Sequence, residues 1–141
     1  GAQAAFRTAI ALDPKYEQAH FGLGNALRDK GDIDGAQAAF RTAIELDPKF
    51  AKAHNNLGTA LLDKGDVDGA MAAHRTAIEL DPKSAKAHNN LGTALHHKGN
   101  VDGAIAAYRT AIQLDPKDAL AHSNLGNTLR TKGDLQGAVT V

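Results

Sequence analysis

The sequence predicts an all-α fold, a right-handed superhelical solenoid of antiparallel helix pairs. Three observations support this prediction. Leu-Asp-Pro recurs with its proline every 34 residues, at Pro14, Pro48, Pro82 and Pro116, and such a period is typical of helical repeats. Each period holds two amphipathic helical patterns, separated by glycine or proline. One pair of short helices cannot bury its own apolar face, so consecutive pairs must stack.

The repeats divide the chain into one solenoid domain. Residues 1–16 correspond to the second helix of a truncated repeat, and residues 17–50, 51–84 and 85–118 are full repeats. Residues 119–141 are expected to form the first helix and the start of the second helix of another truncated repeat. The chain starts within a repeat and without Met, so we expect a fragment of a longer protein. Residues 51–84 and 85–118 agree at 27 of 34 positions, which indicates tandem duplication and leaves engineering open.

The first helix of each repeat is illustrated by the copy that begins at Ala51. Side chains on one face of this helix are expected to pack inward because they recur at helical spacing. They belong to His54, Leu57, Gly58 and Leu61. The helix is expected to stop at Gly65, because glycine suits the left-handed position that follows a helix.

The second helix of the same repeat follows directly. Asp66 is placed to cap its N-terminus, and Pro82 ends it. Its apolar face consists of Val67, Ala70, Ala77, Ile78 and Leu80. Small residues on both helices allow a close approach, and the larger aliphatic side chains fill the space between them.

These residues resemble the pattern of the tetratricopeptide repeat family. That pattern places an aromatic residue, Leu-Gly, a second aromatic, Ala, a third aromatic and Pro at fixed positions in 34. The third full copy carries it as Leu91, Gly92, Leu95, Ala104, Tyr108, Ala111 and Pro116. The resemblance covers the whole chain, and it implies the helix-hairpin solenoid predicted above.

The chain departs from the family pattern at three positions. The second aromatic is leucine, and the first is histidine in each copy, at His20, His54, His88 and His122. If these imidazoles are buried and neutral, a pKa below ~6.5 is expected, and the stability that they give is lost as the pH falls. Glycine replaces the common Glu early in the second helix, at Gly35, Gly69, Gly103 and Gly137. Such a glycine costs up to ~1 kcal/mol relative to Ala, so we expect a less stable array than an idealised one.

Two adjacent asparagines recur in the first helix, although Asn is a poor helix former. Helical geometry puts Lys52, Asn56 and Thr59 opposite the inward face, flanked by Asn55. In the family this face lines the concave groove, so the resemblance implies a binding site for an extended peptide. The candidate groove residues are Asn25, Lys52, Asn55, Asn56, Thr59, Lys86, Asn89, Asn90, Thr93, His97, Asn124 and Asn127.

Asn56, Asn90 and Asn124 are expected to lie in register, one packed helix apart, at ~10 Å. An extended peptide advances ~3.4 Å per residue, so one amide could bind every third residue. This arrangement resembles the asparagine ladder in the repeat domain of O-linked N-acetylglucosamine transferase, with Gly22 interrupting it in the first full repeat. The alternative is a solvated face on which Asn recurs only because the segment was duplicated.

A second family pattern is the clamp for a C-terminal carboxylate, which needs Lys, Asn, Asn, Lys and Arg across three repeats. Asn25, Asn56 and Lys86 match it, whereas Phe21 and Asn90 replace the first Lys and the Arg. Charge-assisted hydrogen bonds are the strong ones. The loss of two cations therefore argues against a carboxylate clamp.

Composition narrows the possible partners. Lys plus Arg and Asp plus Glu both number 16, so no basic field favours nucleic acid. No apolar run approaches the ~20 residues of a membrane span, so no membrane partner is expected. The absence of cysteine fits a reducing compartment, and we expect a cytoplasmic location, although targeting signals could lie outside the chain.

Apparent cofactor and metal motifs fail on spacing. A calcium loop aligned at Asp66 puts Lys64 and Arg75 at ligand positions, and Gly22-Leu23-Gly24 lacks the third glycine of a dinucleotide fingerprint. The four repeated histidines are too far apart to share an ion, and adjacent His96 and His97 diverge by ~100° on a helix. His96 and His97 are more consistent with peptide contacts in the groove or with solvated positions. We therefore expect no cofactor and no metal.

The sequence favours a protein-binding scaffold over an enzyme. There is no cysteine, and the two serines, Ser84 and Ser123, have no base placed beside them. The expected function is to hold an extended peptide or protein segment in the groove through Asn, Thr and Lys side chains. Two alternatives stay open: a recruiting domain of a larger, glycosyltransferase-like enzyme, and a head-to-tail scaffold that forms homo-oligomers by end-to-end stacking.

Overall fold

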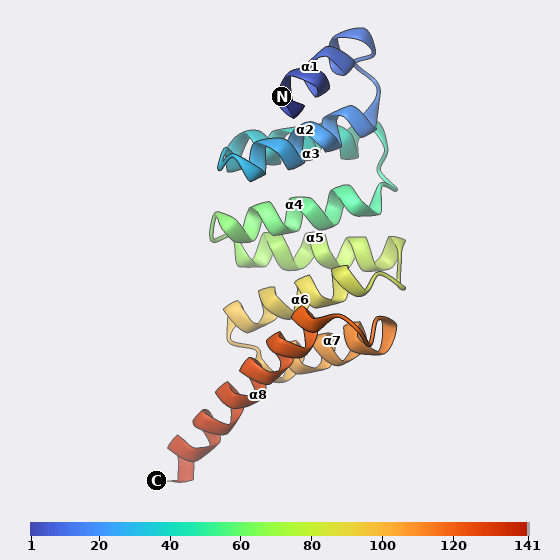
Figure 1. The fold of residues 1–141 in the computed structure, drawn as a ribbon. Coiled ribbons are helices and arrows are strands. Elements are labelled where there is room, and N and C mark those ends of the chain that lie inside the picture. Colours follow the sequence, from blue (N-terminus) through green and yellow to red (C-terminus); the bar gives the residue numbers. More distant parts are fainter. Residues whose placement is uncertain (141) are drawn as a thin grey trace.

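The computed structural model describes the backbone of residues 1–140 and the side chains of residues 1–137. Within this part of the chain it contains eight α-helices and no strand (Figure 1). They are α1 (Ala2–Leu12), α2 (Glu17–Asp29), α3 (Ile33–Leu46), α4 (Ala51–Asp63), α5 (Val67–Leu80), α6 (Ala85–Lys98), α7 (Val101–Leu114) and α8 (Ala119–Thr140). None of these helices combines the length and the apolar character needed to cross a membrane.

The helices stack as a single row of pairs (Figure 1). α2 pairs with α3, α4 with α5 and α6 with α7, and the second helix of each pair also packs on the first helix of the next. The first helices α2, α4, α6 and α8 contact their neighbours directly. The predicted all-α solenoid of helix pairs is therefore confirmed.

Helix ends fall where glycine, cap and proline signals predict them. α4 is followed by Gly65, whose φ of 85° lies in the left-handed region that favours glycine. The Asp66 side chain then accepts a hydrogen bond from the backbone N–H of Gly69 at 2.9 Å, which caps α5. α5 ends at Leu80, two residues before Pro82.

The first-turn glycines of the second helices lie under these caps. Asn100 Oδ1 accepts from Gly103 N at 2.9 Å, and its amide nitrogen lies 2.7 Å from where a Cβ on Gly103 would stand. The Asp66 carboxylate covers Gly69 in the same way. A side chain larger than that of glycine would displace the capping residue. The lower helix propensity of glycine at these positions is therefore offset by the cap interaction, which contributes about 1 kcal/mol.

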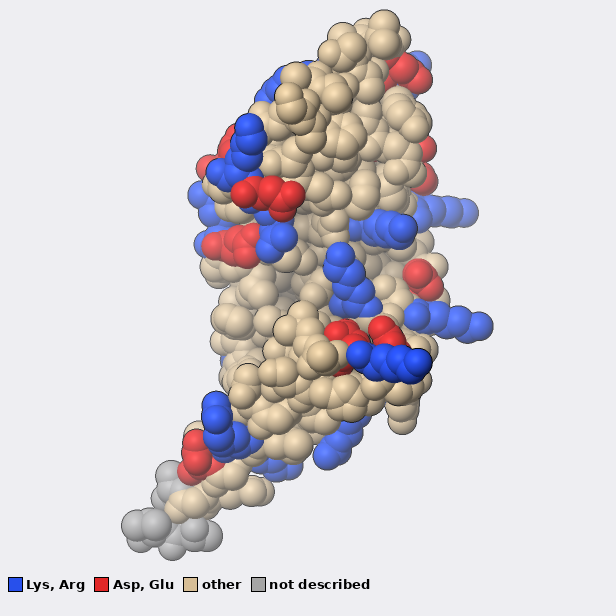
Figure 2. All heavy atoms as spheres, in the orientation of Figure 1, with Lys and Arg blue, Asp and Glu red and all other residues tan. Residues whose placement is uncertain are grey.

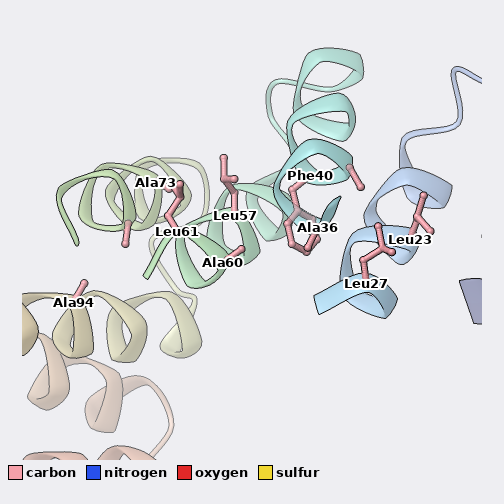
Figure 3. Close-up of a cluster of buried hydrophobic side chains, with 11 residues drawn as sticks. Leu23, Leu27, Ala36, Phe40, Leu57, Ala60, Leu61, Ala73 and Ala94 are labelled. Atoms are coloured by element: carbon pink, nitrogen blue, oxygen red, sulfur yellow. The ribbon is translucent and has the colours of Figure 1, made fainter. Parts of the chain in front are cut away.

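The main apolar core runs through the helix pairs and between them. Leucines of α2 and α4 and the ring of Phe40 belong to one buried cluster, in which Leu61 of α4 lies beside Ala73 of α5 (Figure 3). Alanines allow the backbones to approach, since Ala36, Ala70 and Ala104 are completely buried. Burying each large apolar side chain stabilises the fold by roughly 1.5–3 kcal/mol. This continuous packing makes consecutive repeats depend on one another.

The repeated histidines are not core residues, so the expectation of their burial is wrong. Their side chains lie at the N-terminal ends of the first helices, and they are half-buried or, at His122, exposed. Each Nε2–H donates to the carbonyl of the proline six residues earlier, at 2.9–3.1 Å, in the pairs His20–Pro14, His54–Pro48, His88–Pro82 and His122–Pro116. The imidazole therefore ties the loop between repeats instead of filling the core as an aromatic ring would.

The C-terminal segment also differs from the expectation. α8 continues through Gly133, where a first helix was expected to end and a second to start. Among the described residues, positive φ is found only at Gly31, Gly65 and Gly99. In those repeats, packing of the second helix on the first stabilises the turn, whereas residues 133–137 are exposed and the helical hydrogen bonds simply continue. Residue 141 of the expected second helix lies outside the described residues.

Charged side chains are mixed over the surface rather than gathered by sign, as the face in Figure 2 shows. Three exposed ion pairs connect lysines at equivalent repeat positions to an aspartate of the preceding repeat, at 2.9–3.2 Å: Lys64–Asp34, Lys98–Asp68 and Lys132–Asp102. Exposed pairs of this kind contribute about 0.5 kcal/mol or less. These ion pairs therefore recur with the repeat period but contribute little to the stability of the fold.

Candidate binding groove

Two adjoining hollows run along the first helices and form what we call the groove. The first, of about 450 Å³, is lined by Phe21, Asn25, Ala51, Lys52, Asn55, Asn56, Ala77, Asp81, Ser84, Lys86 and Ala87. The second, of about 420 Å³, is lined by Asn25, Arg28, Asp29, Asn56, Thr59, Lys86 and Asn90. Three residues line both hollows, so the two form one continuous surface across α2, α4 and α6.

Asparagine amides connect consecutive repeats beside this groove. Asn56 Nδ2 donates to Asn25 Oδ1 at 2.7 Å. The equivalent donors of the next two repeats bond to a different acceptor position, from Asn90 Nδ2 to Asn55 Oδ1 at 3.2 Å and from Asn124 Nδ2 to Asn89 Oδ1 at 3.3 Å, because Phe21 stands at that position in the first full repeat. Three repeats therefore donate one amide N–H each back to the repeat before, which fixes the orientation of the donating side chains.

These donating asparagines keep hydrogen-bonding capacity for a ligand. Asn56, Asn90 and Asn124 are half-buried, and each uses one of its two N–H groups in the inter-repeat bond. Among the described residues, no protein donor bonds to their Oδ1 atoms. Each amide therefore presents an acceptor and a second donor, which is the pair that a peptide backbone unit requires.

The neighbouring asparagines are placed differently from the expectation. Asn55 and Asn89 were expected to flank the open face, but they are only 6% and 5% exposed. Their side chains turn between the helices of the pair, where each Oδ1 receives the amide of the following repeat. They support the groove from behind, and Asn55 reaches only the bottom of the first hollow.

The lysines of the groove carry no ion pair within the described residues. Lys52 and Lys86 are exposed and line the first hollow, and Lys86 also lines the second. Arg28, which sequence reasoning overlooked, also lines the second hollow, and its Nε donates to Asp63 Oδ2 at 2.7 Å. The guanidinium charge is thus partly compensated, while the two ammonium groups are available to an acidic partner.

Of the remaining residues that the sequence predicts for the groove, some line it and others lie outside it. Thr59 lines the second hollow, and Thr93 Oγ1 contacts the Tyr108 hydroxyl at 3.0 Å. His97, Asn124 and Asn127 lie farther along the same series of helices, outside the two hollows. Residues of α8 therefore belong to the groove only if a bound segment continues past α6.

Part of the carboxylate-clamp pattern is brought together. Asn25, Asn56 and Lys86 line the same two hollows. Phe21, in place of the first clamp Lys, packs its ring against Phe50 with centroids 4.8 Å apart. This end of the groove therefore offers an apolar surface where the clamp would offer a cation.

One buried polar residue was missed by sequence reasoning. His74 on α5 is 1% exposed, its Nδ1–H donates to Asn55 Oδ1 at 2.8 Å, and its Nε2 has no hydrogen-bond partner among the described residues. Burial lowers the pKa of His74 to about 4, because the charged imidazolium would be desolvated there. The sequence signal was available: His74 occupies the third aromatic position of the repeat, a core position by its spacing.

The other histidines form no metal site. His96 Nδ1 meets Thr128 Oγ1 at 3.2 Å, while His97 Nδ1–H donates to the carbonyl of Thr93 at 2.9 Å. The two rings thus engage different groups. Within residues 1–137, no cluster of three or more His, Asp or Glu side chains could hold a metal ion.

The stacked helix pairs and their polar groove define a helical repeat protein of the interaction-module class. Profiles described as "Tetratricopeptide repeat" match residues 1–36, 23–85 and 75–106, and one described as "TPR repeat" matches residues 92–133. The chain belongs to the tetratricopeptide repeat family. A comparison with curated protein sequences finds no match.

Solved structures share the fold over nearly the whole chain. A crystal structure of MamA superposes with a TM-score of 0.85 at 28% identity, covering 99% of this chain and 82% of that one. The first TPR of Spaghetti (RPAP3), bound to the HSP90 peptide SRMEEVD, gives 0.81 at 19% identity, over 86% and 96%. The Arabidopsis OM64 TPR domain gives 0.77 at 24%, over 79% and 93%. At these lower identities the likeness is one of fold.

Proposed function

We propose that this chain is a protein–protein interaction module that holds an extended peptide segment in its groove. In this proposal Asn56, Asn90 and Asn124 are the rungs of an asparagine ladder. The observation that carries it is the orientation of the three amides, each of which gives one N–H to the preceding repeat and retains an acceptor and a donor. A ladder held in this way needs little reorganisation when it binds.

Two further observations support a peptide as the ligand. A protein of the same fold, the RPAP3 repeat domain, has been solved with a bound peptide. Lys52 and Lys86 line the groove without ion-pair partners among the described residues. We therefore expect the peptide to carry acidic side chains between backbone units that pair with the amides, spaced by about three residues per rung.

Peptide selection followed by affinity measurement tests this function. Random peptides of about a dozen residues would be displayed, selected on the immobilised chain and measured by fluorescence anisotropy. The variant Asn56→Ala, Asn90→Ala, Asn124→Ala is expected to bind the selected peptides at least about tenfold more weakly, because it lacks several hydrogen bonds. Added salt should weaken binding as well, through the two lysines.

A matched control keeps the number and the spacing of the changes. Thr42, Thr76 and Thr110 lie one repeat apart on the second helices, line neither hollow, and donate only to carbonyls of their own helix. Replacing all three with Ala should leave affinity unchanged. If the asparagine variant folds and binds as tightly as the parent chain, or if no peptide is selected at all, the ladder is not a peptide site.

A second candidate function is head-to-tail association of copies of this chain. The specific observation in its favour is that one face of α8 is uncovered. Leu129 is 41% exposed, whereas the equivalent Leu95 and Leu61 are 5% and 7% exposed. Gly126 has open space beside it, whereas Gly92 faces the Tyr108 ring of its own repeat. We propose that α1 of a second copy, with Phe6 in the equivalent aromatic position, packs on this face.

Light scattering over a range of concentrations tests the association. The average mass should rise with concentration, and Leu129→Asp should suppress the rise because a charge on this face opposes burial. Leu135→Asp, also on exposed α8 but beyond the repeat-equivalent face, serves as a control for the change of charge. A mass that stays at that of one chain up to millimolar concentration would exclude self-assembly.

A further inference from the structure

A chain of hydrogen bonds leads from the core of the second full repeat to the groove. The buried His74 Nδ1–H donates to Asn55 Oδ1 at 2.8 Å. The same oxygen accepts a second bond, from Asn90 Nδ2 at 3.2 Å. Asn90 lines the second hollow of the groove. The position of one ladder amide is therefore set by Asn55, which is in turn held by the imidazole.

The imidazole is an unfavourable choice for packing alone. Its Nε2 is buried without a hydrogen-bond partner, and an unsatisfied buried acceptor destabilises the folded state. The equivalent positions of the adjacent repeats hold Phe40 and Tyr108, which fill the same slot over a glycine. A phenyl ring at this position would avoid the unsatisfied nitrogen, but it could not donate to Asn55.

We propose that His74 is a positioning residue of the groove, which orients Asn90 for peptide binding by fixing Asn55. The inference rests on the proposed peptide-binding function and adds to it a residue that does not touch the ligand. It also ranks the rungs. Asn124 bonds to Asn89 at 3.3 Å, and Asn89 receives no bond from Tyr108, so of Asn90 and Asn124 the former is held by the longer chain of hydrogen bonds.

Two substitutions separate positioning from packing, because their expected effects on binding do not follow their expected effects on stability. His74→Phe removes both the donor and the unsatisfied nitrogen, so a higher melting temperature and weaker binding are expected. His74→Asn can place its Nδ2 where the imidazole Nδ1 lies, but it leaves a cavity where the rest of the ring was, so a lower melting temperature and retained binding are expected. A purely structural residue would give affinity changes that follow stability.

The affinity probe is a peptide selected on the parent chain, at a temperature at which all variants are folded. His74→Phe should weaken its binding by roughly 3- to 10-fold, the effect of one hydrogen bond. Tyr108→Phe is the matched control, because it removes a buried-ring hydroxyl that bonds to Thr93 and not to the asparagine chain. It should leave the affinity unchanged.

A readout without ligand keeps the inference testable if no peptide is found. The side-chain NH₂ signals of Asn90 and Asn124 can be assigned by NMR with the single alanine variants. His74→Phe should shift or broaden the Asn90 signal and leave the Asn124 signal in place, and His74→Asn should restore it. An Asn90 signal unchanged by His74→Phe would overturn the positioning role, whereas failure to select a peptide would count against the proposed function alone.

Discussion

The second and third full repeats, residues 51–84 and 85–118, agree at 27 of 34 positions and form the same helix pair. They differ in the ring that fills the centre of the pair. In both, the ring lies over a glycine, with Cε1 of His74 or of Tyr108 at 2.7 Å from where a Cβ on Gly58 or Gly92 would stand. The phenol is long enough to bring its hydroxyl to Thr93 at 3.0 Å, whereas the imidazole leaves Nε2 without a partner.

This difference shows that one backbone slot can hold rings with opposite acid–base consequences. Burial lowers the pKa of His74 to about 4, so the second repeat is sensitive to acid. Burial raises the pKa of Tyr108, and its hydrogen bond to Thr93 opposes that rise. Both shifts come from desolvation of the charged form. The third repeat is therefore indifferent to mild acid at this position, and the two repeats can be distinguished by titration.

The largest expected effect is loss of stability in acid through His74. In the unfolded chain its pKa is about 6.5 and in the folded chain about 4, so only the unfolded state takes up the proton between these values. The stability given by neutral His74 is complete above about pH 6.5 and is lost as the pH falls to about 4, a total of about 3 kcal/mol. Urea unfolding across this range measures it.

His74→Phe provides the control, since carboxylates also titrate in part of this range. The variant should lose less stability than the parent chain, and the difference between them isolates His74. Parallel pH profiles for the parent and His74→Phe would contradict the burial of a neutral imidazole.

The next effect concerns the glycines under the rings. Gly58→Ala or Gly92→Ala would place a methyl against a fully buried ring, and such overpacking costs about 1–3 kcal/mol against a helix-propensity gain of up to about 1 kcal/mol. We expect a net loss from thermal unfolding in both repeats. Gly126→Ala is the matched control, because nothing lies within 4 Å of its added methyl. It should stabilise by up to about 1 kcal/mol, and a loss there as large as at Gly92 would reject the steric explanation.

Much of the fold could be predicted because its determinants are local and repeated. The 34-residue period, the turn glycine at Gly65, the cap at Asp66 and the break at Pro82 each act within a few residues of their position. The groove lining could be predicted only in part. Helical geometry placed Asn56 and Lys86 correctly on the open side. Asn55 precedes Asn56 and is turned by about 100° around the helix axis, toward the edge of the inward face, where packing between helices decides whether a side chain is buried.

The errors have a common physical cause, since each depends on a contact that helical periodicity does not encode. His54 and His74 are the same residue type, but His54 Nε2–H donates to the loop carbonyl of Pro48, whereas His74 is buried over Gly58 of its own repeat. His74 was overlooked because its partner, Asn55, belongs to the other helix of the pair. α8 continues through Gly133 because the turn seen in other repeats depends on packing that residues 133–137 lack.

The smallest expected change in stability concerns the residues that cap the second helices of the two repeats. Asp66 and Asn100 each accept a backbone N–H at 2.9 Å, from Gly69 and Gly103. Replacing either with Ala should cost about 1 kcal/mol in chemical unfolding, because the hydrogen bond is lost. Exchanging them, as Asp66→Asn and Asn100→Asp, should change stability by no more than about 0.5 kcal/mol, since both residues cap equally well and differ only in the screened interaction of one charge with the helix dipole.

The direction of that small change is itself informative. A carboxylate at a helix N-terminus is favoured by the dipole, so Asn100→Asp should be the more stable of the two exchanges. The gain should shrink in high salt, because the caps are exposed and screening weakens the dipole interaction. A salt-independent difference would instead reflect cap geometry, in which the amide of Asn100 and the carboxylate of Asp66 lie over their glycines at different distances.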